Sequence, residues 1–214
     1  MRNMKILGLC LLGALAAMAI MGAGTASATK LCSVNTSPCP AGNTYAKGTA
    51  IKAQLVPGTT STMSSGFVNI SCTESTISGK TTSEGGAGAV TGSISSVTWK
   101  GCTSGLGACT ASALNTPWSA EVSGSGGNGT MAISGAGGKF TCGGTTCEYS
   151  ASKASVSVSG GNPATIKASS ISFSRIGGGF LCSSTASWSG TYEATAPLPR
   201  STSPASSGGP SFLA

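Results

Sequence analysis

The stretch that decides the fold is SWSGTYEA, residues 187–194. Trp188, Gly190, Tyr192 and Ala194 occupy every second position, and serine, threonine and glutamate fill the positions between them. A period of two places alternate side chains on opposite faces of an extended chain, so one face is buried and the other meets water. The stretch therefore predicts a half-buried antiparallel β-strand.

The same alternation recurs along the chain, whereas no helical period follows residue 28. Shorter alternating runs lie at residues 51–55, 68–72, 118–122, 131–133, 140–142 and 156–158. Glycine pairs or triplets separate them, at residues 85–86, 126–127, 137–138, 160–161 and 177–179. Strands at this spacing number about nine to eleven and are typical of an all-β antiparallel sandwich or a barrel-like domain.

Two segments share a break in the alternation. In ISSVTW, residues 94–99, and in ASSISF, residues 168–173, the apolar positions change parity at a Ser-Ser pair. A strand keeps its faces unless a residue is inserted, so each pair predicts a β-bulge or a corner between sheets.

The two ends of the chain differ from its middle. Residues 1–28 combine Arg2 and Lys5, an apolar run from Ile6 to Met21 and the small-residue cleavage signal at 26–28, which indicates a secretory signal peptide. A retained membrane anchor is the alternative. Residues 197–214 are rich in proline, serine and glycine and are expected to be a disordered tail. One domain, residues 29–196, remains between them.

The cysteines predict how this domain is stabilised. The signal peptide contains Cys10, and eight cysteines remain in the exported chain: Cys32, Cys39, Cys72, Cys102, Cys109, Cys142, Cys147 and Cys182. An even number in an exported protein indicates disulfides, and eight cysteines allow 105 connectivities. Spacing favours the local pairs Cys32–Cys39, Cys102–Cys109 and Cys142–Cys147, which leaves Cys72–Cys182. No CxxC motif and no His are present, so no metal site is predicted.

Composition bears on the chemistry that the chain can perform. It contains no His and no Asp, which removes His-activated nucleophiles and His-based metal sites. Its five acidic residues, Glu74, Glu84, Glu121, Glu148 and Glu193, are scattered, whereas glycoside hydrolysis needs two facing carboxylates. We therefore predict no catalytic residues, no cofactor and no enzyme.

The basic residues are also scattered. Without Arg2 and Lys5 the chain keeps ten of its 12 Lys and Arg against five Glu, a net charge of +5. Nucleic-acid binding needs clustered positive charges, so no nucleic-acid partner is expected. No association with a membrane is expected after the signal peptide is cleaved. The oligomeric state stays open.

Large amphipathic side chains are the remaining binding candidates. Trp118, Trp188 and Tyr192 lie in alternating runs, and an aromatic strip on a sheet face can hold sugars or apolar ligands. The favoured alternative is that these rings anchor a small core.

Five motifs resemble a known group of proteins. They are CTEST at 72–76, WKGC at 99–102, ALNTPW at 113–118, GGNPAT at 160–165 and SWSGTYE at 187–193. Their arrangement over about residues 30–196 is similar to secreted, cysteine-rich, all-β proteins that soil actinobacteria carry in many copies, a group with no known activity. More distantly, the order of Cys72, Gly101-Cys102, Pro117-Trp118 and Cys182 resembles the alkane-oxidation-activator family. That resemblance implies an accessory role during growth on hydrophobic substrates.

We therefore expect a non-enzymatic secreted or cell-surface protein that acts by binding or adhesion. Its partner would be cell wall, polysaccharide or a hydrophobic surface. A structural coat or matrix component is the alternative, with self-association as its signature.

Overall fold

The computed structural model describes residues 29–34, 39–66, 68–86 and 88–196 and is all-β. The strands are β1 (Ala50–Leu55), β2 (Ser61–Ser65), β3 (Val68–Thr81), β4 (Val90–Ser104), β5 (Gly107–Leu114), β6 (Trp118–Ser125), β7 (Asn128–Cys142), β8 (Thr145–Ser159), β9 (Thr165–Gly178) and β10 (Thr185–Ala196). The predicted signal peptide and C-terminal tail lie outside these residues. Within them, no helix has the length and hydrophobicity needed to span a membrane.

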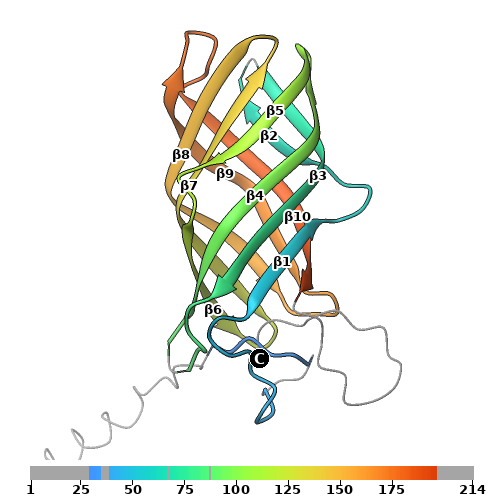
Figure 1. Ribbon diagram of the computed structural model, residues 1–214, viewed down its shortest axis with the longest axis vertical. Helices are drawn as coiled ribbons and strands as arrows, with labels where there is room; N and C mark the ends of the chain where they lie inside the picture. The colour runs from blue at the N-terminus through green and yellow to red at the C-terminus, as the bar shows by residue number, and fades with distance from the viewer. Residues whose placement is uncertain (1–28, 35–38, 67, 87, 197–214) are drawn as a thin grey trace, which may run out of the picture.

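Antiparallel pairing joins all ten strands into one closed barrel (Figure 1). Two positions in the barrel are shared by two short strands each. β1 and β2 both pair with β10 and β3, and β5 and β6 both pair with β4 and β7. The barrel therefore has eight strand positions, and of the two architectures expected from the sequence it is the barrel that forms.

The connections define two ends. The β2–β3, β4–β5, β7–β8 and β9–β10 connections lie at the upper end in Figure 1, and the β3–β4, β6–β7 and β8–β9 connections lie at the lower end. The β7–β8 hairpin pairs Cys142 with Thr145 across Gly143 and Gly144, which have φ of 53° and 80°. A two-residue hairpin of this type needs positive φ at both central positions, which glycine adopts without steric cost.

Both predicted bulges are confirmed. Opposite Ser78 and Gly79 of β3, strand β4 steps from Ser96 to Ile94, so Ser95 is the extra residue. In β9 the bulge lies between Ile171, which pairs with Trp188 of β10, and Ala168, which pairs with Gly190. Strand β9 therefore has one residue more than β10 over this stretch, and Ser170 within it has φ 52°. Each bulge moves the buried side chains to the other parity, so a strand of 14 or 15 residues bends and still faces the interior along its length.

Polar and apolar side chains are separated by the barrel wall. Serine, threonine and lysine cover much of the outside, while the buried residues form one apolar cluster. The interior changes along the barrel: cystines lie toward the upper end, aromatic rings near the middle and aliphatic side chains toward the lower end.

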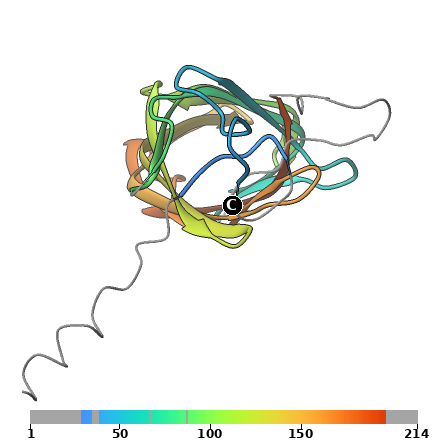
Figure 2. The same cartoon turned by 90° about the horizontal axis from the view of Figure 1, so that it is seen from below.

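The segment before β1 closes the lower end. Seen from below, the blue N-terminal segment crosses the ring of strands (Figure 2). Its Leu31 and Tyr45 side chains are buried in the core cluster, and the backbone N–H of Tyr45 donates to the carbonyl of Leu31 at 2.9 Å. Thr29 Oγ1 donates to the Gly124 carbonyl at 3.1 Å, which ties the segment to β6. The interior is therefore covered at this end.

All eight cysteines of the domain are paired, as Cys32–Cys39, Cys72–Cys102, Cys109–Cys142 and Cys147–Cys182. The predicted Cys32–Cys39 pair is confirmed, and the other three predicted pairs are wrong. The last three disulfides lie near the upper end, where each joins neighbouring parts of the wall.

Strand register explains the three corrections. The Gly143-Gly144 turn places Cys147 opposite Phe140, so it does not face Cys142. Cys182 follows β9 and bonds to Cys147 of β8. Strand β8 lies across the barrel from β3, which contains Cys72. The remaining four cysteines form a row across four neighbouring strands, in the order 72, 102, 109 and 142. If Cys102 bonded to Cys109, then Cys72 and Cys142 would have no neighbouring partner. Pairing Cys72 with Cys102 and Cys109 with Cys142 leaves no thiol free.

Candidate binding site

The structure places the predicted aromatic platform inside the barrel. Trp118 and Trp188 are at most 8% exposed, and Tyr192 is fully buried. The indole N–H of Trp118 donates to the carbonyl of Leu114 at 2.7 Å, and the Trp188 and Tyr192 ring centroids lie 5.9 Å apart. Trp188 and Tyr192 are buried because the even-numbered residues of β10 face the interior of the barrel. These three rings therefore form core, which was the favoured alternative, and they offer no platform on the outer face.

A small polar cluster stabilises the middle of this core. Trp188 Nε1 donates to Ser61 Oγ at 2.9 Å, and the Tyr192 hydroxyl lies 3.2 Å from Ser61 Oγ and 3.1 Å from Ser75 Oγ. One hydroxyl has one hydrogen, so Tyr192 donates to one serine and accepts from the other. Burial raises the pKa of the Tyr192 phenol above its ordinary value, and the serine hydrogen bonds oppose that shift. The cluster satisfies every polar atom it contains by mutual pairing.

The exposed large apolar side chains gather at the upper end. Among the described residues they are Leu106, Ile176, Phe180 and Leu181, which we call the apolar tip. Phe180 is 92% exposed, and the other three are between 44% and 55% exposed. Leu106 lies in the β4–β5 turn, Ile176 bulges from β9, and the remaining two belong to the β9–β10 loop. Ile176, Phe180 and Leu181 are close together in the chain, whereas the β4–β5 turn that carries Leu106 lies across the barrel from β9 and β10. Adjacent exposed apolar side chains, such as Phe180 and Leu181, mark an interaction surface more often than an isolated one does.

The loop that carries Phe180 is held firmly. Arg175 Nη1 donates to the carbonyls of Gly179, at 3.2 Å, and of Cys182. The N–H of Cys182 donates to the Gly179 carbonyl at 3.1 Å, and the Cys147–Cys182 disulfide fixes the loop to β8. From β8, the Tyr149 hydroxyl donates to the Ser183 carbonyl at 3.2 Å. Phe180 is thus displayed on a loop whose backbone is already ordered.

One positive charge, on the exposed Arg175, lies at the edge of the tip. The described residues of the four upper connections include no Lys, Arg or Glu. Arg175 donates to loop carbonyls, and Lys139 forms an ion pair with Glu148 at 3.3 Å. The described parts of the connections are therefore uncharged themselves, and the Arg175 guanidinium lies beside them.

The acidic residues do not assemble into a site. Across the described ranges, no three His, Cys, Asp or Glu side chains come close enough together to hold a metal ion. Glu74, Glu84 and Glu121 are exposed, while Glu148 and Glu193 are half-buried on different strands. No family model, curated protein or solved structure matches the chain.

Sequence reasoning missed the apolar tip. Its residues fall in glycine-rich connections, where alternation carries no information about facing. One signal was available: Phe180 and Leu181 are two bulky apolar residues between the Gly177–Gly179 run and Cys182, inside a predicted loop. Large apolar side chains in an exposed loop are unusual, and a neighbouring disulfide holds them in place.

Proposed function

We propose that the protein is a non-enzymatic secreted binding protein that attaches to apolar surfaces through the apolar tip. The observation that carries this proposal is Phe180, 92% exposed on a loop fixed by Arg175 and the Cys147–Cys182 disulfide. Four disulfides favour an oxidising, extracellular location. A loop that is ordered before contact loses little conformational entropy on binding.

An apolar surface fits the tip better than a polysaccharide does. Sugar binding on sheet faces uses exposed aromatic rings flanked by polar groups, but Trp118, Trp188 and Tyr192 are buried. The described residues of the upper connections include no carboxylate and no cluster of cations, and Arg175 alone offers little to a charged polymer. An uncharged hydrocarbon-like phase complements it. This chemistry agrees with the accessory role on hydrophobic substrates that the distant resemblance implies.

The expected affinity is modest. Transfer of one large apolar side chain from water contributes about 1.5–3 kcal/mol. Only Phe180 gains nearly the whole of that, because the other three side chains are already half-covered. Micromolar binding corresponds to about 8 kcal/mol, so a single tip binds an apolar surface weakly.

A structural coat is the second candidate function. The same tip would then meet the tip of a second copy, and the protein would assemble without any added phase. Both the first and last described residues, Thr29 and Ala196, lie at the lower end, so the tip is unobstructed by them in either case (Figure 1).

Co-sedimentation and flotation test the proposal. Oxidised protein lacking residues 1–28 is mixed with hexadecane droplets, chitin, insoluble glucan and isolated cell wall. We expect saturable retention on the droplets that survives high salt, because apolar contacts are not screened. Retention on chitin, glucan or cell wall alone would contradict the proposal. Pelleting of the protein alone would favour the coat.

A pair of variants assigns any retention to the tip. Phe180→Ser with Leu181→Ser removes the two apolar side chains of the loop, and Val56→Ser removes a half-buried one from the β1–β2 connection. We expect the double variant to lose at least tenfold in droplet affinity and Val56→Ser to keep it. Equal retention by both variants would mean that the tip is not the binding surface.

A further inference from the structure

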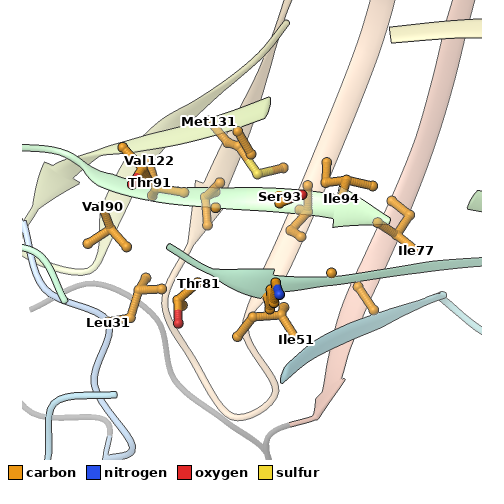
Figure 3. Close-up of a pocket in the computed structure, with 17 residues that line it drawn as sticks. Leu31, Ile51, Ile77, Thr81, Val90, Thr91, Ser93, Ile94, Val122 and Met131 are labelled. Atoms are coloured by element: carbon orange, nitrogen blue, oxygen red, sulfur yellow. The ribbon is translucent and has the colours of Figure 1, made fainter. Parts of the chain in front are cut away.

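The barrel contains a cavity at the end opposite to the apolar tip. Its volume is about 90 Å³, and side chains from seven strands and the N-terminal segment line it (Figure 3). Leu31 covers it from below, and Ile51, Ile77 and Ile94 face it from β1, β3 and β4. A water molecule needs about 10–15 Å³ in this measure, so the space is several times larger than one water.

The lining offers almost nothing to water. Thr81 Oγ1 donates to the Ala46 carbonyl at 2.8 Å and accepts from the Thr49 N–H at 3.0 Å, so its hydrogen bonds run to the N-terminal segment. The Thr91 hydroxyl pairs with that of Thr82 at 2.7 Å on the outside, and Lys80 is exposed. A stable internal water needs two to four polar partners. The cavity therefore favours an apolar occupant over water.

Small residues create the space. Ala53 and Ala120 are buried and line the cavity from β1 and β6, where larger side chains would fill it. Of the two lining glycines, Gly79 has a different cause: a Cβ there would lie 2.3 Å from the Ser93 carbonyl oxygen, so strand contact requires glycine. A Cβ on Gly92 would lie 3.2 Å from the Lys80 carbonyl oxygen, which is a tight but milder approach. The two alanines are thus positions at which a larger side chain would reduce the volume.

A second void continues upward from the first. It measures about 30 Å³, shares Ile77 and Ile94 with the larger cavity, and reaches Trp99, Trp118 and Trp188. The two voids are therefore neighbours, with the same two isoleucine side chains lining both. A slender molecule reaches from the larger void toward the smaller one more readily than a round one does.

We propose that this cavity binds a short, uncharged alkyl chain, which enters at the lower end and extends toward the tryptophan layer. The site is independent of the apolar tip, which lies at the other end of the barrel. Entry at the lower end passes Leu31. The bonds of the N-terminal segment to the barrel lie on either side of Leu31, at Thr29 with Gly124 and Gly86, and at Ala46 to Thr49 with Thr81. Local opening of such a segment requires less free energy than global unfolding.

Methyl-detected NMR with n-pentane as the probe tests this site. We expect saturable shifts of the Ile51, Ile77 and Ile94 methyl groups in the full oxidised domain, together with a change in tryptophan fluorescence. The midpoint of thermal unfolding should rise with pentane and level off, as binding to the folded state alone requires. Shifts confined to Leu106, Ile176 and Leu181, or shifts that never saturate, would overturn the proposal.

Cavity-filling variants complete the test. Ala120→Leu should weaken pentane binding at least tenfold, and the smaller Ala120→Val, which is less prone to overpacking, should weaken it in the same direction. Ser119→Val, at the neighbouring outward position of β6, is the matched control and should bind as the wild type does. Unchanged binding by a folded Ala120→Val or Ala120→Leu would place pentane elsewhere. The double variant Phe180→Ser with Leu181→Ser should bind pentane as the wild type does. A failure of the cavity proposal can therefore be told apart from a failure of the apolar-tip proposal.

Discussion

Arg175 donates a hydrogen bond from Nη1 to the carbonyl oxygen of Gly179, at a distance of 3.2 Å. The same nitrogen also donates to the Cys182 carbonyl, so one guanidinium bridges the two ends of the turn that contains Phe180 and Leu181. The bond joins the end of β9 to the loop that follows it, and it acts on the backbone, not on the apolar side chains.

Arg175→Gln should loosen this loop without unfolding the barrel. Arg175 is exposed, so its loss should lower the free energy of unfolding by less than about 1 kcal/mol. Hydrogen exchange at the N–H of Cys182, which is bonded to the Gly179 carbonyl, should become faster by an order of magnitude or more. Lys153→Gln, on the exposed face of β8, is the control. Equal exchange in both variants would show that the disulfide alone orders the loop.

The disulfide connectivity makes a second prediction. Peptide mapping of the unreduced protein should recover Cys72 with Cys102, Cys109 with Cys142, and Cys147 with Cys182. Replacing both Cys109 and Cys142 by Ala should cost about 3–4 kcal/mol at most, because that bond closes a loop of 33 residues. A peptide joining Cys102 to Cys109 would contradict the register described above.

The bulge in β9 gives a third prediction, with its control one residue away. Ser170 has φ 52°, a conformation that costs a residue with a Cβ about 1–2 kcal/mol, and its N–H donates to Ser189 Oγ at 2.9 Å. Ser170→Gly keeps that bond and should raise the free energy of unfolding by about 0.5–1 kcal/mol. Ser169→Gly, where φ is not positive, should lower it by a similar amount. Urea unfolding would measure the free energy of unfolding of both variants. A lower value for Ser170→Gly than for the wild type would mean that the positive φ at Ser170 does not destabilise the protein.

Sequence patterns located eight of the ten strands and both bulges, because both follow from local parity, but named no run in β2 or β5. The Ser95 and Ser170 bulges are visible as a change in which positions are apolar, and the fold preserves that change. Barrel closure was not decided by the sequence, since a sandwich and a barrel bury alternate residues alike. Closure depends on which strands meet after a long separation, such as β1 with β10, and local patterns do not encode that pairing.

The disulfides and the tip were missed for related reasons. Local spacing suggested Cys142–Cys147, but a two-residue hairpin turn sets their register and places Phe140 opposite Cys147. The exposure of Phe180 depends on the loop conformation that Arg175 and Cys182 impose, and loops have no period from which facing can be read. The aromatic rings were placed in the right strands, and their burial follows from the closed interior that only the assembled barrel provides.

Tyr192 makes stability depend on alkaline pH. Burial raises the pKa of its phenol in the folded protein above the value of about 10 that tyrosine has in an unfolded chain. The folded state therefore keeps this proton to a higher pH than the unfolded state does. The resulting stabilisation is complete below about pH 10 and is lost as the pH rises through the folded pKa, at up to about 1.4 kcal/mol per pH unit.

Tyr192→Phe isolates this contribution. The variant cannot ionise at this position, so its stability should fall less steeply than that of the wild type above about pH 10. Below that pH the variant should be less stable by about 1–3 kcal/mol, because Ser61 and Ser75 each lose a buried partner. Urea unfolding at a series of pH values, with short incubations that keep the disulfides intact, would measure the difference between the two proteins. That difference should shrink as the pH rises. A difference that stays constant would show that the Tyr192 phenol ionises equally readily in the folded and unfolded states.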